Sequence, residues 1–200
     1  MCVTSTTVII NDMSSNQTSS NPQMISASKP DWSREKIERW WSPGKQLIRS
    51  IRQYQYYKKK GGSLAHLLAK IYVIKHRFWS VVSGADIPLN CQLGGGLLLI
   101  HPNGVVIHPK AVIGCNCLIL QQVTVTSDVK IGGHVDIGAG AKIINEVTIS
   151  NHARIGANAV VLCDIPEGAV AVGVPARIIH SKQYKNSNNS LKSMEVVKVD

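Results

Sequence analysis

Residues 107–166 read IHPKAV IGCNCL ILQQVT VTSDVK IGGHVD IGAGAK IINEVT ISNHAR IGANAV VLCDIP. An aliphatic residue opens every group of six, and a small or branched apolar residue stands four positions later in each group. This spacing fits neither an α-helix, with a period of about 3.6 residues, nor a simple strand, with a period of about 2. It is typical of hexapeptide solenoids, in which each group forms one short strand and one turn and stacked coils bury a common core. We therefore predict an all-β parallel β-helix of hexapeptide repeats over residues 85–180.

The repeat slips at one point. Upstream of Ile107 the same phase continues through Leu99, Leu93 and Ile87, but two extra residues separate Leu99 from Ile107. The slip contains His101-Pro102-Asn103-Gly104. A break in a regular solenoid marks a loop that leaves the scaffold, and loops held by a rigid scaffold often carry function. His101 is therefore a candidate functional residue.

The segments at the two ends of the chain differ from the β-helix in composition. Residues 1–30 are rich in Ser, Thr and Asn. We predict that they form a disordered leader, because they offer little apolar surface to offset the entropy of ordering the chain. Their short apolar run has no basic region ahead of it, so they do not read as a signal peptide. Residues 181–200 are predicted to be a disordered tail.

Residues 31–84 carry the start and stop signals of helices. The signals are Asp31 before a first helix through Trp41, Ser42-Pro43 and Gly61-Gly62 around a second, and Ser63 and Gly84 around a third. In the third, apolar residues recur at helical spacing. We expect a small N-terminal α-helical subdomain in front of the β-helix.

The charge of the chain is strongly positive, with 22 Lys and Arg against 12 Asp and Glu. Such a balance attracts anions, which include nucleic acids, membrane surfaces, phosphorylated cofactors and acidic glycans. Twelve of the basic residues lie between Arg34 and Arg77. They form either a solvated helix face or a docking surface for an anionic glycan or a peripheral membrane contact. We expect no nucleic-acid partner, because no base-reading motif is present.

The cysteines and the hydropathy bear on location and on metals. The five cysteines show no zinc or redox spacing, which favours a reducing compartment. No apolar run reaches the roughly 18 residues of a membrane span, so we expect a cytoplasmic protein. His134 and His152 are 18 residues apart and would stack on one corner of the solenoid. Because no third ligand accompanies them, we favour a solvated corner over a zinc site and expect no metal.

Five ordered motifs resemble those of bacterial serine acetyltransferases and of related acetyltransferases of capsule and exopolysaccharide pathways. They are Asp86-Ile87-Pro88, His101 to Val106, Leu120 to Thr124, Ile137 to Ile143, and Val172 to Arg177. The resemblance implies a left-handed, three-sided prism with three hexapeptides per coil. It also implies a homotrimer or a dimer of trimers, with an acetyl-CoA groove between neighbouring subunits.

The same resemblance implies an acetyl-CoA-dependent O-acetyltransferase with assigned residues. His101 is the general base that removes the proton of the acceptor hydroxyl, and Asp86 orients its ring. Gly138, Ala139, Gly140 and Ala141 let the pantetheine arm approach the backbone, and Lys142 and Arg177 meet the phosphates. The alternatives are that His101 is a histidine at a subunit contact and that the Gly-Ala run consists of corner residues, with Ala141 facing the core.

The sequence departs from serine acetyltransferases at the acceptor. The acidic residue that precedes the catalytic histidine in that family is replaced by Ile100, and a longer loop is missing between Val123 and Ile131. A serine ammonium would lose its charge partner, and the serine carboxylate would lose a candidate arginine. We therefore expect a sugar of a surface polysaccharide as the acceptor, with L-serine of cysteine biosynthesis as the alternative. A non-catalytic solenoid scaffold is a remoter alternative.

Overall fold

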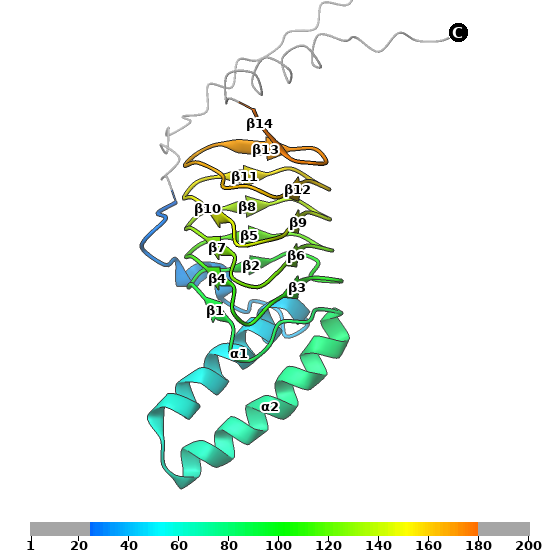
Figure 1. The fold of residues 1–200 in the computed structure, drawn as a ribbon. Helices are drawn as coiled ribbons and strands as arrows, with labels where there is room; N and C mark the ends of the chain where they lie inside the picture. Colours follow the sequence, from blue (N-terminus) through cyan, green and yellow to red (C-terminus); the bar gives the residue numbers. More distant parts are fainter. Residues whose placement is uncertain (1–24, 180–200) are drawn as a thin grey trace, which may run out of the picture.

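The computed structural model describes residues 25–179 (Figure 1). The predicted tail, and the predicted leader apart from residues 25–30, lie outside the described residues. The fold is a left-handed parallel β-helix with an N-terminal helical part, as predicted. Figure 1 shows the coils stacked into a prism and a helical hairpin extending from the end that carries the first strand.

Short parallel strands build the prism. They are β1 Gln92–Leu93, β2 Leu98–Leu99, β3 Val106–Ile107, β4 Val112–Ile113, β5 Leu118–Ile119, β6 Thr124–Val125, β7 Lys130–Ile131, β8 Asp136–Ile137, β9 Lys142–Ile143, β10 Thr148–Ile149, β11 Arg154–Ile155, β12 Val160–Val161, β13 Val170–Val172 and β14 Arg177–Ile179. Three sheets form its sides, in the orders β1-β4-β7-β10, β14-β13-β11-β8-β5-β2 and β12-β9-β6-β3. The pairing of β13 with β14 is antiparallel.

The register follows from the aliphatic position of each hexapeptide. Ile113 pairs with Ile131, and Ile131 pairs with Ile149, so each coil contains three hexapeptides. All three isoleucines are buried, and the small apolar residues four positions further on, such as Val135 and Ala153, are also buried. Each coil covers the apolar side chains of the one below it. Burial of this continuous column stabilises the prism at about 25 cal/mol per Å² of apolar surface.

The helical part consists of η1 (Trp32–Glu35), α1 (Pro43–Lys60) and α2 (Ser63–Ser83). The side chain of Asp31 accepts a hydrogen bond from the Ser33 N–H, as expected of a helix cap. The first helix, however, ends at Glu35 and not at Trp41. The bounds of the second and third helices agree with the predicted ones within a residue.

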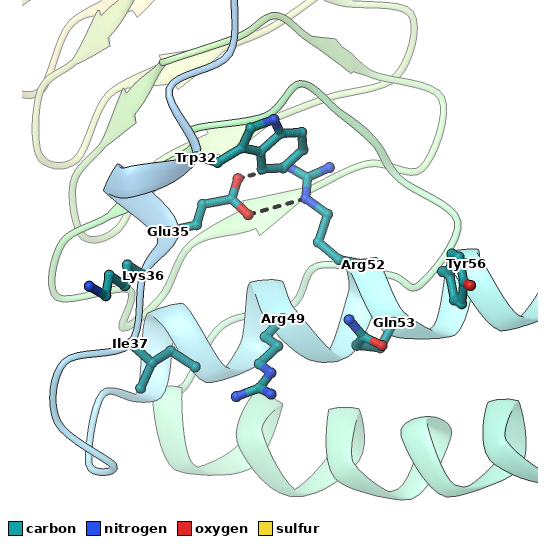
Figure 2. A pocket seen from close by; sticks show the side chains of 8 residues that line it. All are labelled: Trp32, Glu35, Lys36, Ile37, Arg49, Arg52, Gln53 and Tyr56. Atoms are coloured by element: carbon teal, nitrogen blue, oxygen red, sulfur yellow. Dashed lines mark hydrogen bonds and ion pairs between the residues drawn. The ribbon is translucent and has the colours of Figure 1, made fainter.

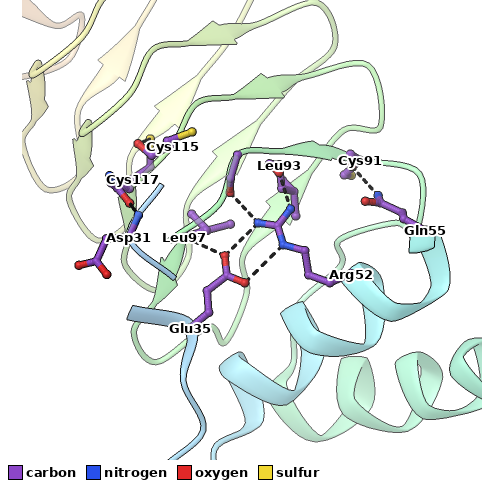
Figure 3. A network of polar contacts seen from close by, with 11 residues as sticks. Asp31, Glu35, Arg52, Gln55, Cys91, Leu93, Leu97, Cys115 and Cys117 are labelled. Atoms are coloured by element: carbon purple, nitrogen blue, oxygen red, sulfur yellow. Dashed lines mark hydrogen bonds and ion pairs between the residues drawn. The ribbon is translucent and has the colours of Figure 1, made fainter. Parts of the chain in front are cut away.

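The early end of η1 has a tertiary cause (Figure 3). The Glu35 carboxylate accepts hydrogen bonds from Nη2 of Arg52, at 2.9 Å, and from the Leu97 N–H, at 3.1 Å. Arg52 also donates to the carbonyls of Leu93 and Gly94. This network joins η1 and α1 to the first coil, and these contacts outweigh the weak local preference for a longer helix.

The first half of α1 closes the lower end of the prism. Its buried residues Leu47, Ile48 and Ile51 belong to the same apolar core as the coils. Gly44 allows this approach, because a Cβ at that position would lie 2.7 Å from the Leu99 carbonyl oxygen. Solenoids need such terminal caps, since the last coil would otherwise expose its core.

Residues 25–31 run along the outside of the prism and are held by Asn116. The buried Nδ2 of Asn116 donates to the carbonyls of Ser26 and Lys29, each at 2.7 Å. Its Oδ1 accepts from the Asp31 N–H, also at 2.7 Å. The last residues of the predicted leader therefore contact the β-helix through the side chain of one corner residue.

We expect Asn116→Gly to lower the free energy of unfolding by about 1–3 kcal/mol, because three hydrogen bonds are lost. Glycine keeps the positive φ of 59° at this corner, so backbone strain does not contribute. Asn158→Gly is the matched control, since Asn158 is a corner asparagine with a φ of 56° and an exposed side chain. Urea unfolding measures both variants, and equal losses would contradict the role of Asn116.

Candidate active site

Most of the residues that the sequence singles out lie along one edge of the prism. This edge, which we call the β2–β3 edge, joins the six-stranded sheet to the sheet that contains β3. Its turns are residues 100–105, 120–123, 138–141 and 156–159. Backbone hydrogen bonds of 2.8–2.9 Å stack each turn on the next: Gln122 N–H to Asn103, Gly140 N–H to Gln121, and Asn158 N–H to Ala139.

His101 lies in the longest of these turns. Its side chain is exposed and its backbone φ is +50°. Each higher turn of this edge has one residue with a positive φ, and these residues, Gln122, Gly140 and Asn158, are spaced 18 apart. Gly104, which lies 18 residues before Gln122 and also has a positive φ, takes the equivalent position in the His101 turn. The two extra residues therefore add a second left-handed residue, and it is His101. Seven other non-glycine residues of the described prism, among them Gln122 and Asn158, also have a positive φ, so this conformation is usual for its corners. What distinguishes His101 is that it is additional to the regular left-handed position of its turn.

Asp86 lies on the lowest rung of the sheet that contains β3. Its N–H donates to the Val105 carbonyl at 2.8 Å, and its carbonyl accepts from the Ile107 N–H at 3.0 Å. The carboxylate is exposed. Within residues 25–179, no hydrogen bond joins it to the His101 ring. The orienting role of Asp86 therefore stays a prediction. The absence of this hydrogen bond does not exclude the role, because catalytic hydrogen bonds often form only in the presence of substrate.

Lys142 stands above Asp86 on the same sheet. The intervening rungs pair Asp86 with Val106, Val106 with Thr124, and Thr124 with Lys142. The Lys142 ammonium bends toward the β2–β3 edge, where it donates to the Gln122 carbonyl at 2.6 Å. The structure thus brings this cation next to the turn stacked directly above the His101 loop.

The Gly-Ala run forms the third turn of the edge. Gly138, Ala139 and Gly140 are partly exposed there, so their backbone is accessible. The Ala141 side chain is completely buried and faces the core, as one of the two alternatives expected. Gly138 also borders a largely apolar cavity of about 210 Å³ on the six-stranded sheet. The distance along the edge from this turn to the His101 turn is two rungs, or about 10 Å.

Arg177 lies at the upper end of the prism. It is exposed and pairs with Val172 in the β13–β14 hairpin. The turn of this hairpin packs on β12, where the Val160 N–H donates to Gly173 and the Val160 carbonyl accepts from Ala176. Since Val160 pairs with Lys142, the turn of the hairpin lies over the sheet that contains Lys142, whereas Arg177 itself is on β14 in the six-stranded sheet.

A cavity of about 420 Å³ opens beside His101. It is lined by Ser42, Pro43, Gly44, Lys45, Val82, Ser83, Leu99, His101, Pro102 and Asn103. Sequence reasoning did not connect the start of α1 with His101. Ser42-Pro43 gives a helix start, but the contact with the His101 loop depends on how α1 closes the prism, which no local signal specifies.

A second cavity of about 490 Å³ lies between η1 and α1 (Figure 2). Trp32 and Tyr56 border it, and the Arg52 guanidinium in its wall is paired with Glu35. None of the predicted site residues lines this cavity. It therefore contributes nothing to the chemistry that the β2–β3 edge can carry.

His134 and His152 stack on another corner, as their 18-residue spacing predicts. Their Nδ1 atoms are 2.8 Å apart, so one ring donates a hydrogen bond to the other. Burial lowers the pKa of His134 below its usual value, the nearby His152, Arg34 and Arg154 act in the same direction, and Asp136 opposes them. Within residues 25–179, no group of three or more His, Cys, Asp or Glu side chains is arranged to hold a metal ion.

The histidine pair predicts a pH dependence of stability. Because the pKa of His134 is lower in the folded chain, the unfolded chain binds more protons just below the ordinary histidine pKa of about 6.5. Stability is therefore lost as the pH falls through this window. We expect the decrease in melting temperature between about pH 7 and about pH 5 to be smaller in His134→Asn, which tolerates the φ of +53°. His66→Gln, an exposed substitution on α2, is the control. Identical profiles for His134→Asn and the parent protein would contradict this assignment.

Comparisons with known proteins bear on the family. Residues 110–145 match the family described as bacterial transferase hexapeptide (six repeats). A serine acetyltransferase of Synechococcus elongatus is 38% identical over 108 residues, which are 50% of this chain and 44% of the relative. A soybean serine acetyltransferase structure complexed with serine superposes with a TM-score of 0.58 at 31% identity, covering 70% of this chain and 58% of that one. A Brucella abortus serine acetyltransferase in complex with coenzyme A has a TM-score of 0.58 at 32% identity, with 70% and 56% covered.

The resemblance to serine acetyltransferases is confirmed. It extends through the β-helix and part of the helices, since the superposed structures cover 70% of this chain. The chain spans about half the length of the curated relatives that it matches.

Proposed function

We propose that this chain is an acetyl-CoA-dependent O-acetyltransferase in which His101 acts as the general base. The observation that carries the proposal is the β2–β3 edge. It places the His101 loop, the Gly138 to Gly140 turn and the Lys142 ammonium along one line of stacked turns. The likeness to serine acetyltransferases, one of them in complex with coenzyme A, supports the same reaction.

The chemistry that His101 supplies is removal of a proton. An alcohol attacks a thioester readily only as its O–H bond weakens, and a neutral imidazole is a suitable base near neutral pH. The hydroxyl oxygen forms a bond to the acetyl carbonyl carbon as its proton moves to His101. The resulting tetrahedral intermediate expels the CoA thiolate, which accepts the proton from His101, and the acetyl group remains on the oxygen as an ester. His101 is exposed at the mouth of the 420 Å³ cavity, so an acceptor can reach it.

We assign acetyl-CoA binding to the part of the β2–β3 edge above the His101 loop. The exposed backbone of Gly138 to Gly140 permits close approach of an extended arm, because no side chain projects there beyond the Ala139 methyl. Lys142 and Arg177 lie on the two sheets that meet at this edge, and they supply positive charge for phosphates. The chemistry needs no metal ion.

L-serine is the acceptor that the relatives support best. We expected a sugar hydroxyl, with L-serine as the alternative, and the similarity to serine acetyltransferases favours the alternative. One structural observation keeps the sugar as a second candidate. Ile100, directly before His101, is 41% exposed and presents no carboxylate to a serine ammonium.

We further propose that the chain assembles as a homotrimer, as the resemblance implies. The exposed strand residues Val106 and Val112 leave apolar side chains on the outer surface of two sheets of the prism. A neighbouring subunit could cover them and complete the walls of the β2–β3 edge. The alternative of a non-catalytic scaffold explains neither the two extra residues of the His101 turn nor the accessible glycine turn two rungs above it.

The base is tested with His101→Asn, because asparagine tolerates a positive φ and the loop should keep its shape. We expect release of CoA thiol from acetyl-CoA to fall by a factor on the order of 10²–10⁴, whereas acetyl-CoA binding stays unchanged. Thiol titration and calorimetric binding measure the two quantities. Undiminished turnover would exclude His101 as the base, and failure of the parent protein to bind acetyl-CoA would favour the scaffold.

The acceptor is tested by offering L-serine and de-O-acetylated capsular oligosaccharides to the parent protein. We expect turnover with L-serine. Ile100→Asp should raise kcat/KM for L-serine by about tenfold, because a carboxylate beside the base pairs with the ammonium. Ile100→Asn is the matched control, since it is polar but uncharged. Turnover with the oligosaccharide alone would make the sugar the acceptor.

A further inference from the structure

Helix α2 has an apolar face that nothing in the described chain covers. Its members recur at alternating spacings of three and four residues, and all of them are exposed. They are Leu64, Leu67, Ile71, Ile74, Phe78 and Val81, and we call them the α2 stripe. Leu64 is 69% exposed, Ile74 is 71% exposed and Val81 is 83% exposed. The opposite face, with Ala65 and Ala69, is buried. Contiguous exposed apolar surface of this kind marks an interaction site.

Aromatic side chains extend the stripe toward the prism. Phe78 contacts Trp79 edge-on, with ring centroids 5.0 Å apart, and Trp79 contacts Trp41 at 5.9 Å. Trp40 lies 5.1 Å from Trp41 and is 74% exposed. Exposed tryptophans beside aliphatic residues are characteristic of surfaces that meet the boundary between lipid and water.

The charge around the stripe has a single sign. Residues 43–83, which contain α1 and α2, have nine Lys and Arg residues and no Asp or Glu. Exposed Lys70 and Arg77 border one side of the stripe, and exposed Lys75 borders the other. Packing α2 against α2 of a second copy would bring these cations together, and such like-charge contacts disfavour pairing. The partner is therefore expected to carry negative charge.

Among anionic partners, a lipid surface can contact both the apolar α2 stripe and the cations that flank it. A soluble acidic glycan would pair with the cations but would leave the apolar stripe in water. An amphipathic helix with Lys and Arg flanking Leu, Ile, Phe and Trp lies in the plane of a membrane, with its apolar face between the lipid headgroups. No helix in residues 25–179 is long and apolar enough to cross a bilayer.

We infer that the α2 stripe docks this protein on an anionic membrane surface. The inference does not depend on the proposed acetyl transfer, but it bears on where the site would operate. The carbonyl of Gly84, directly after α2, accepts a hydrogen bond of 2.8 Å from the Gly104 N–H in the His101 loop. A lipid-bound α2 would therefore hold this loop close to the membrane surface.

Sedimentation of the full chain with lipid vesicles tests the inference. We expect binding to vesicles of phosphatidylcholine with phosphatidylserine, little binding to phosphatidylcholine alone, and weakening by salt. Ile74→Glu should abolish binding without unfolding the chain, because Ile74 is exposed. The double variant Lys70→Glu and Arg77→Glu should weaken binding by at least about tenfold. Its matched control is Lys110→Glu with Lys130→Glu, which makes the same charge change on the exposed surface of the prism.

Two outcomes would overturn the inference. One is that the parent protein binds vesicles of neither composition, and the other is that Ile74→Glu leaves vesicle binding unchanged. If the parent protein does not bind vesicles and Ile74→Glu also lowers the mass measured by sedimentation, a second copy of the chain covers the stripe. His101→Asn should bind vesicles like the parent protein. Loss of catalysis and loss of docking are therefore measured separately.

Discussion

The structure depends on its 18-residue register. This register places each hexapeptide directly above the hexapeptide that lies three repeats earlier in the chain. In this register Ile113, Ile131 and Ile149 form one buried column, and equivalent columns run inside the other two sides of the prism. A shift of the register by one residue would point these side chains toward the solvent, because neighbouring positions of a strand face opposite sides of the sheet. The same register stacks the corner turns, so residues far apart in sequence form continuous edges. The candidate site is one of these edges, and its geometry follows from the packing of the core.

The site differs from the rest of the prism by one local irregularity. Two extra residues in the turn 100–105 leave Gly104 in the regular left-handed position and add His101 as a second left-handed residue. The turn can bulge because it is the lowest on its edge and is supported from below by Gly84 and the closed end of the prism. The turns above it, including Gly138 to Gly140, keep the regular shape. A regular scaffold thus holds an accessible glycine turn at a fixed distance from an irregular loop that carries a base.

The sequence predicts the repeat and the register because these depend on local periodicity. It also predicts the bounds of α1 and α2, because Pro43 can start a helix and glycines follow both helix ends. It also places His101 in a loop, because the phase slip is visible in the spacing of Leu99 and Ile107. Contacts between distant segments are not encoded in this local way. The early end of η1 depends on the pairing of Glu35 with Arg52, and the course of residues 25–31 depends on one buried asparagine. Likewise, the spacing in α2 predicts an apolar face but not whether the chain itself covers it.

If acetyl-CoA binds at the β2–β3 edge, the affinity for CoA depends on Lys142, and titration calorimetry with CoA measures this dependence. Lys142→Met removes the cation that reaches the edge, and Lys130→Met removes an exposed cation from a different sheet, so the two variants have the same net charge. We expect a Kd about tenfold higher for Lys142→Met and an unchanged Kd for Lys130→Met. Equal affinities of both variants and the parent protein would contradict binding at this edge.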